Sequence, residues 1–340
     1  MKNMLQINQL NMTLVATIIL FIGLFSLGSL RYTGFFSLQV FLNLFIDNAF
    51  LIIVATGMVF VIISGGIDLS VGSVIALTTM VCAALLKKGV NPIVVILLVL
   101  IMGFLFGLAQ GYVIQRFKLH PWIVTLAGLF LARGLCYLIS VESIDINNKL
   151  FETISQYKIP LGGQYNVSIS VIISLVFVLG AMYIGKYTEF GRTVFAIGGN
   201  EQSAILMGLP VERTKVFIYA ISGFSSALSG LVFSFYMLSG YGLHALGMEM
   251  DAIAACVIGG VLLTGGYGFI IGPMFGVLSM GVIQTIIMFE GTLSSWWTRI
   301  VIGILLFIFI VLQRVIVVQK ERNTTLIKRK AVKISTSNSV

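Results

Sequence analysis

Charged side chains are scarce in this chain of 340 residues, making up 10% of the sequence, whereas 58% of it is hydrophobic. A soluble globular domain carries about 25% charged residues, so this chain lacks the polar surface to cover itself in water. The composition excludes a soluble protein and indicates an all-α polytopic membrane protein. Because each helical span needs about 20 apolar residues and a connection, the length leaves no room for a large soluble domain.

Cysteine and histidine are equally sparse, with three and two residues. Cys82, Cys136 and Cys256 stand in apolar segments without CxxC spacing, which favours small buried side chains over a disulfide or a metal site. His120 and His244 lie far apart and form no HExxH pattern. The sequence therefore predicts no metal site, no cofactor and no catalytic pair, which argues against an intramembrane enzyme.

The chain also lacks a convincing phosphate-binding loop. Residues 180–186 match most of GxxxxGK, but Tyr187 stands where Ser or Thr would bind magnesium, and the run ends an apolar segment. We expect no ATP hydrolysis by this chain, so an energy source must come from another subunit or an ion gradient. An ion-driven carrier usually keeps ionisable relays within its spans. The few candidates are Asp47, Arg133, Glu249 and Asp251.

What is abundant is apolar sequence. We predict a short polar N-tail at 1–11, one transmembrane domain at 12–318 and a basic C-tail at 319–340. The ten expected spans are 12–30, 44–63, 69–86, 92–115, 121–140, 168–185, 215–238, 250–263, 269–289 and 296–318, of which the eighth and ninth could form one re-entrant pair.

The basic residues predict the orientation of these spans. If both tails are cytoplasmic, fourteen of the 21 Lys and Arg residues lie inside, as the positive-inside rule requires. The net charge of +9 therefore marks topology and lipid headgroup contacts rather than nucleic-acid binding. We expect a multi-pass protein of the bacterial inner membrane with both termini cytoplasmic.

One span is interrupted by the sequence SGGIDLSVG, which contains Gly65, Gly66, Asp68, Ser70 and Gly72. Irregular Gly-rich backbone survives in a membrane only where protein or a water-filled cavity surrounds it. Asp68 then either lines a translocation pathway or, as we prefer, caps the next helix near the cytoplasmic boundary.

A second Gly pair lies in a segment with weak sequence similarity to this break. Gly259 and Gly260 open the run GGVLLTGG, which shares a Gly-Gly, apolar, Leu, Ser/Thr and Gly pattern with residues 65–72. Transporters are often built from two related halves with broken helices in corresponding places. The shared pattern favours a duplicated architecture with both Gly pairs in the pathway.

Residues 186–214 form the most informative hydrophilic loop. They predict a helix of about seven residues, with Asn200 as N-cap, Glu201 in its first turn and Gly208 as its stop. So short a helix needs a docking partner, since isolated helices become stable only at about 12 to 15 residues. We expect residues 204–207 to present its apolar contact surface, folded back on the membrane and neighbouring loops or inserted into a separate cytoplasmic protein.

Three segments together resemble the permease subunits of bacterial monosaccharide ABC importers of the ribose, xylose and arabinose group. They are SGGIDLSVGSVIAL, FGRTVFAIGGNEQSAILMGL and DAIAACVIGGVLLTGGYG, in that order along nearly the whole chain. The late segment FEGTLSSWWTRIVIGILLFIFIVLQR resembles a permease chain of the galactofuranose importer. The resemblance implies a type II importer permease fold.

It also implies a second permease chain, a cytoplasmic ATPase that uses ATP and Mg²⁺, and a periplasmic sugar-binding protein. We see no cluster of carboxylates and aromatics that would form a tight sugar site, and the resemblance assigns selectivity to the binding protein. A bulky residue at Gly199 or Ala204 should uncouple ATP hydrolysis from uptake. The residues that would couple to the ATPase are Gly191, Arg192, Gly198, Gly199, Asn200, Glu201, Ala204 and Gly208.

The residues leave other functions open. An ABC permease could carry ribose, a nucleoside, a branched-chain amino acid or a signalling sugar, and an ion-coupled secondary transporter would need no ATPase at all.

Overall fold

The computed structural model describes residues 2–160, 162, 165–294, 296–313 and 315. Within this part, eight helices are long and apolar enough to cross a membrane, which confirms the predicted all-α polytopic fold. They are α1 (Lys2–Arg31), α2 (Leu38–Ile63), α4 (Pro92–Phe117), α5 (Pro121–Ile139), α7 (Ile169–Tyr187), α10 (Val211–Met237), α12 (Gly272–Glu290) and the C-terminal helix (Trp296–Gln313).

Two of the ten expected spans are shorter than a full crossing. The third is α3 (Val71–Lys87), and the eighth is α11 (Met248–Ile258). Each adjoins an irregular segment, since α3 follows residues 64–70 and α11 precedes residues 259–271. The eighth and ninth spans are therefore two helices separated by a long irregular connection.

Several helix ends differ from those we predicted. The expected N-tail is helical from Lys2, because a helix already formed extends cheaply by one hydrogen bond per residue. Helix α2 begins at Leu38 because the Ser37 hydroxyl caps it, accepting from Val40 N at 3.1 Å. The predicted C-tail 319–340 lies outside the described residues.

Helices α2 and α10 form the centre of the molecule. The second half of α2 is almost wholly buried, and α10 packs against α4, α2 and α3. The approach of α4 to α10 needs glycine, since a Cβ on Gly107 would lie 2.0 Å from the Tyr219 carbonyl oxygen. By contrast, α4 and the C-terminal helix expose large apolar side chains such as Leu97 and Phe307, as helices facing lipid do.

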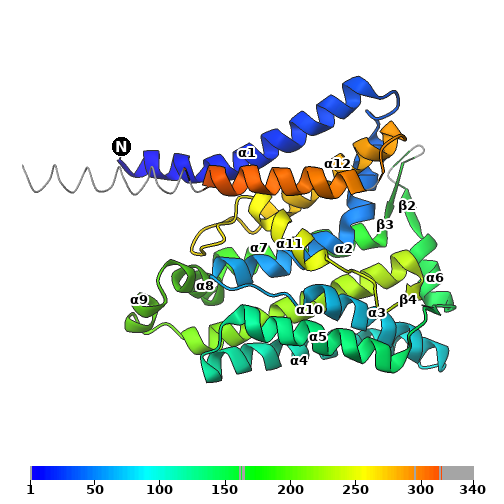
Figure 1. Ribbon diagram of the computed structural model, residues 1–340, viewed down its shortest axis with the longest axis horizontal. Helices are drawn as coiled ribbons and strands as arrows, with labels where there is room; N and C mark the ends of the chain where they lie inside the picture. The colour runs from blue at the N-terminus through cyan, green and yellow to red at the C-terminus, as the bar shows by residue number, and fades with distance from the viewer. Residues whose placement is uncertain (1, 161, 163–164, 295, 314, 316–340) are drawn as a thin grey trace, which may run out of the picture.

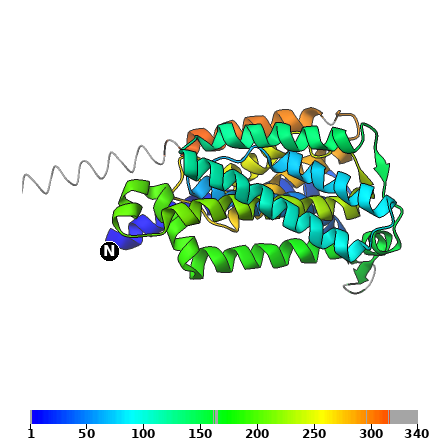
Figure 2. The same ribbon diagram turned by 90° about the horizontal axis from the view of Figure 1, so that it is seen from below.

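The connections collect at the two ends of the helical bundle (Figure 1). At one end lie α8 (Glu189–Gly199) and α9 (Glu201–Leu206), together with the start of α1 and the end of the C-terminal helix. Figure 2 shows the same arrangement from below. At the other end lie α6 (Lys149–Gln156) and two antiparallel strand pairs, β1 (Ile144–Asp145) with β4 (Ser239–Gly240) and β2 (Lys158–Pro160) with β3 (Asn166–Ser168).

Candidate functional site: two broken helices and the α8–α9 hairpin

The first break, residues 64–70, begins with a sharp helix stop. Gly65 has φ +82°, and its N–H and that of Gly66 donate to the carbonyls of Ile62 and Val61, both at 2.9 Å. This pair of bonds is the Schellman motif, which satisfies the last carbonyls of a helix and requires a left-handed residue that is usually glycine. The predicted break at the Gly pair is therefore present.

Asp68 lies at the centre of the first break and is only 1% exposed. Its Oδ1 accepts from the backbone N–H of Ser70 at 2.9 Å and from the Ser70 hydroxyl at 2.6 Å. Its Oδ2 accepts from the Ser222 hydroxyl of α10 at 2.6 Å. Three hydrogen bonds thus offset the burial of one carboxylate, as a buried charge requires.

This geometry corrects our interpretation of Asp68 as a simple helix cap. The residue before α3 is Ser70, whose side chain accepts no hydrogen bond from the helix. Among the backbone N–H groups at this helix start, Asp68 accepts only from that of Ser70. The Ser70 hydroxyl also lies 3.2 Å from Gln110 Oε1 on α4. The Thr125 hydroxyl of α5 approaches the Ile67 carbonyl at 3.3 Å. Asp68 and its neighbours thus join the first break to three surrounding helices.

The second break, residues 259–271, starts with the same helix stop. Gly260 has φ +86°, and the N–H groups of Gly260 and Val261 donate to the carbonyls of Val257 and Cys256, both at 3.0 Å. Gly65 therefore corresponds to Gly260, one residue away from our pairing of the two Gly pairs. Gly259 instead packs on the start of α12, where a Cβ would lie 2.4 Å from the Gly272 carbonyl carbon.

Neutral side chains from two outer helices donate hydrogen bonds to the backbone carbonyls at the end of α11. The Thr17 hydroxyl of α1 donates to the Ile258 carbonyl, and Gln313 Nε2 of the C-terminal helix donates to the Val257 and Val261 carbonyls at 2.9 and 3.3 Å. Burial raises the pKa of the Tyr267 phenol in this break to about 12. The phenol is therefore protonated at neutral pH, and the second break contains no carboxylate.

The two breaks meet each other and the end of α8 at a contact made of backbone. We call Gly65, Gly198, Gly265 and Gly266 the glycine junction. Gly266 N donates to the Ile63 carbonyl at 2.8 Å. A Cβ on Gly198 would lie 1.8 Å from the Ile63 oxygen, and one on Gly265 would lie 2.9 Å from Gly65 N. Any side chain at Gly198 would therefore push α8 away from both breaks.

Helices α8 and α9 form a hairpin whose local signals match the sequence prediction. The Thr188 hydroxyl caps α8 by accepting from Gly191 N at 3.2 Å. Asn200 Oδ1 caps α9 by accepting from Ser203 N at 2.8 Å. Gly208, with φ +77°, follows the end of α9, and Pro210 precedes α10. The predicted short helix is confirmed with six residues rather than seven.

The four residues 204–207, expected to form one apolar contact surface, divide between a buried and an exposed side. Ala204 is fully buried against Ile197 and Val211, so a bulky residue there would disturb the hairpin itself. The outward side chains are Ile205, Leu206 and Met207, which are 55%, 88% and 66% exposed; we call them the apolar tip.

The remaining predicted residues divide between exposed and buried positions. Arg192, Gly199 and Asn200 are exposed, and a Cβ on Gly199 would meet no atom within 4 Å. Gly191 is buried where α8 turns back on α7, and Gly72 lies against Glu249 of α11. Glu201 forms an ion pair with Lys215 of α10, at 2.6 Å, which ties α9 to α10.

Sequence reasoning missed Gln110, Ser222, Thr17 and Gln313. Each is a polar residue inside or at the end of an apolar helix, which is the signal that could have found them. The run at residues 180–186 lies inside α7 and not between a strand and a helix, so it has no phosphate-loop geometry.

Comparison with known proteins now decides the family. Residues 40–310 match the model described as "Branched-chain amino acid transport system / permease component". The chain belongs to this permease family. It is 50% identical over 300 residues to the inner membrane ABC transporter permease protein YjfF of Escherichia coli K12, which covers 86% of this chain and 90% of that relative.

Other relatives of this permease are named for the sugar that they import. This chain is 37% identical to the fructose import permease protein FruG of Bifidobacterium longum, over 89% of this chain and 90% of FruG. It is also 37% identical to the ribose import permease protein RbsC of Haemophilus influenzae, over 76% of this chain and 80% of RbsC. These relatives are named as permease components, not as ATPases. No solved structure matches the chain.

Proposed function

We propose that this chain is the membrane permease subunit of an ABC importer that carries a monosaccharide, galactofuranose, into the cytoplasm. The relatives named for fructose and ribose support a sugar as cargo. Galactofuranose rests on the resemblance of the late segment FEGTLSSWWTRIVIGILLFIFIVLQR. The chain itself would bind no cofactor, since a separate cytoplasmic ATPase would use ATP and Mg²⁺.

The observation that carries this proposal is the α8–α9 hairpin. It presents the apolar tip to the outside of the molecule, while Gly198 near the end of α8 contacts both breaks. A partner that pulls or turns the hairpin would therefore act on both broken helices at once. The predicted coupling residues exposed to such a partner include Arg192, Gly199 and Asn200.

The remaining partners and the orientation follow the same proposal. We place the hairpin and both termini in the cytoplasm and the chain in the bacterial inner membrane, beside a second permease chain and a periplasmic sugar-binding protein. In support, the start of α1, the hairpin and the end of the C-terminal helix lie at one end of the bundle (Figure 1).

The family description favours one alternative cargo, a branched-chain amino acid. Uptake assays with labelled leucine and labelled sugars, in cells that lack this chain and in cells that regain it, separate the two. Restored leucine uptake without restored sugar uptake would reject the sugar assignment. Sugar uptake by the purified chain in liposomes, driven by a proton or sodium gradient without an ATPase, would reject the ABC mechanism.

Substitution of the apolar tip tests the coupling role. Burying a leucine side chain is worth about 1.5 to 3 kcal/mol, so Leu206→Asp should weaken ATPase binding and lower uptake at least about tenfold. The matched control is Val141→Asp, another exposed apolar position (69%) in a connection at the opposite end. Equal uptake by the two variants, with equal ATPase recovery on purification, would contradict the role of the hairpin.

A further inference from the structure

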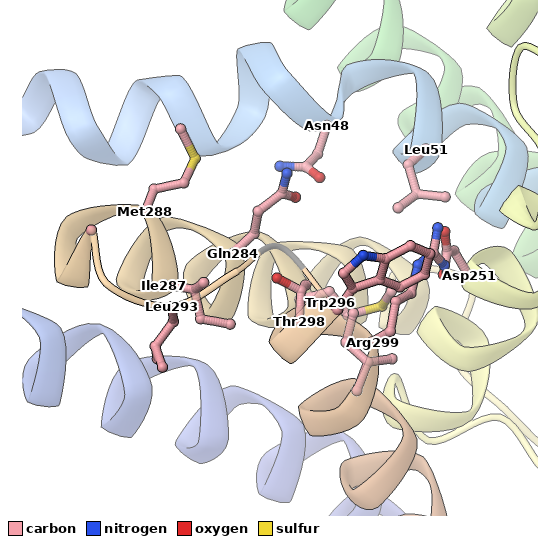
Figure 3. A pocket seen from close by; sticks show the side chains of 13 residues that line it. Asn48, Leu51, Asp251, Gln284, Ile287, Met288, Leu293, Trp296, Thr298 and Arg299 are labelled. Atoms are coloured by element: carbon pink, nitrogen blue, oxygen red, sulfur yellow. Dashed lines mark hydrogen bonds and ion pairs between the residues drawn. The ribbon is translucent and has the colours of Figure 1, made fainter.

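An open cavity of about 780 Å³ lies between α2, α11, α12 and the C-terminal helix (Figure 3). It lies in the half of the molecule away from the α8–α9 hairpin. Arg31 at the end of α1 pairs with Glu290 at the end of α12, at 3.2 Å, and Gly291 directly after α12 lines the cavity. With the hairpin in the cytoplasm, the cavity belongs to the periplasmic half.

Two amide side chains meet inside this cavity from facing helices. Asn48 of α2 and Gln284 of α12 point toward one another (Figure 3). Asn48 is 8% exposed, and its Nδ2 donates to the Leu44 carbonyl at 2.9 Å. Among the described residues, Asn48 Oδ1 and the whole Gln284 amide have no hydrogen-bond partner. Since amides offer donors and acceptors together, this pair can hold a hydroxyl group, which is also both.

An ion pair and an indole complete the polar part of the lining. Arg299 Nη1 donates to Asp251 Oδ1 at 2.5 Å, which joins the C-terminal helix to α11. Trp296 stands one helical turn from Arg299 and is 75% exposed. Its indole offers a flat apolar face with a polar edge, of the kind that covers the apolar face of a small polar ligand.

The sequence alone showed no cluster of carboxylates and aromatics for a tight sugar site, and this cavity brings together one carboxylate, one indole and two amides. The sequence separates Asn48, Asp251, Gln284 and Trp296 by up to 248 positions, and only the packing of four helices gathers them. A largely apolar cavity with a few convergent polar groups is the usual form of a small-molecule site. A lipid acyl chain would leave the two amides and the ion pair without hydroxyl partners.

We propose that this cavity binds the transported monosaccharide in the periplasmic half of the permease. The amides of Asn48 and Gln284 and the Asp251–Arg299 pair would bind its hydroxyls, and Trp296 would cover its ring. This inference rests on the proposed function and names the substrate contact within it.

Cysteine labelling of Gln284→Cys tests the site directly. The three native cysteines are buried, so background labelling is low. The complex with ATPase and binding protein is placed in nanodiscs and treated with a methanethiosulfonate reagent, in the presence of galactose, ribose, fructose or leucine. The sugar that the wild-type complex takes up should slow labelling about fivefold. The same sugar should leave Asn147→Cys, an exposed position in a connection outside the cavity, unchanged.

Two outcomes overturn the inference. One is labelling of Gln284→Cys that no transported sugar slows, and the other is labelling that is blocked equally without sugar, as by lipid or the second permease chain. Absence of any sugar uptake by the wild-type complex would reject the proposed function instead, so the two failures are distinguishable.

Uptake by amide variants gives an independent test. Asn48→Leu and Gln284→Leu keep the side-chain size and remove the amides, and each should lower uptake about fivefold. Asn147→Leu is the matched control, and recovery of the assembled complex is measured for all three. Wild-type uptake by both cavity variants would reject the site while leaving the sugar importer in place.

Discussion

The two broken helices end alike but are held differently. The first break is bound by a buried carboxylate, since Asp68 accepts hydrogen bonds from Ser70 and from Ser222 of the central helix α10. The second break is bound by neutral side chains of the outer helices, Thr17 of α1 and Gln313 of the C-terminal helix. Hydrogen bonds to a charged group contribute about 1.5 to 3 kcal/mol each, against about 0.5 to 1.5 kcal/mol for neutral ones.

The difference indicates a division of roles between the breaks. The first is fixed to α4, α5 and α10, so we expect it to move less than the second. The second carries weaker bonds from helices at the periphery, and residues 264–268 within it reach α8 through the glycine junction. The second break is therefore the one that a movement of the hairpin displaces at lower cost.

The largest expected effect is at Asp68. Asp68→Leu removes the acceptor of three hydrogen bonds and leaves the Ser70 N–H and the Ser222 hydroxyl buried without it. We expect a loss of unfolding free energy of about 3 kcal/mol or more. Thermal unfolding of the purified chain in detergent measures it.

The control for this variant is Asp145→Leu, at an exposed carboxylate of β1. It should unfold at nearly the wild-type temperature. Equal unfolding temperatures for Asp68→Leu and wild type would remove the basis for the comparison of the two breaks, because the carboxylate would then contribute nothing.

The next largest effect is expected for substitutions in the glycine junction. Gly198→Val places side-chain atoms where the Ile63 oxygen lies, so we expect the hairpin to separate from the breaks and uptake to fall at least about tenfold. Gly199→Val is the matched control, since a Cβ at this neighbouring position would meet no atom within 4 Å. An effect of Gly199→Val would therefore come only from contact with the ATPase, as measured by co-purification. Normal uptake by Gly198→Val would show that the junction transmits nothing.

The smallest effects belong to the second break. Thr17→Val and Gln313→Leu each remove neutral hydrogen bonds to the end of α11, and each should lower the unfolding free energy by about 1 kcal/mol. The two sites donate to different carbonyls, so a double variant should approach the sum of the single effects. A loss as large as that of Asp68→Leu would reverse the assignment of the fixed and the displaceable break.

Local signals predicted the parts of this permease that depend on neighbours in the chain. The sequence predicted that Asn200 caps α9 and that α9 ends before Gly208, because helix caps and helix stops are formed within a few residues. The burial of Ala204 could not be predicted from the sequence. Its partners Ile197 and Val211 belong to α8 and α10, and their contact depends on how these helices pack on α9.

The sequence by itself determined a polytopic helical membrane protein, because 10% charge and long apolar runs leave no other way to satisfy the backbone. It also indicated that helices break near the two Gly pairs, since glycine is needed at the left-handed stop. Only the tertiary structure decided that Asp68 and its neighbours join the first break to α4, α5 and α10, that both breaks meet α8 through backbone atoms, and that four helices line one open cavity with a few polar groups. Those features depend on distances between residues far apart in the chain, which helix periodicity does not encode.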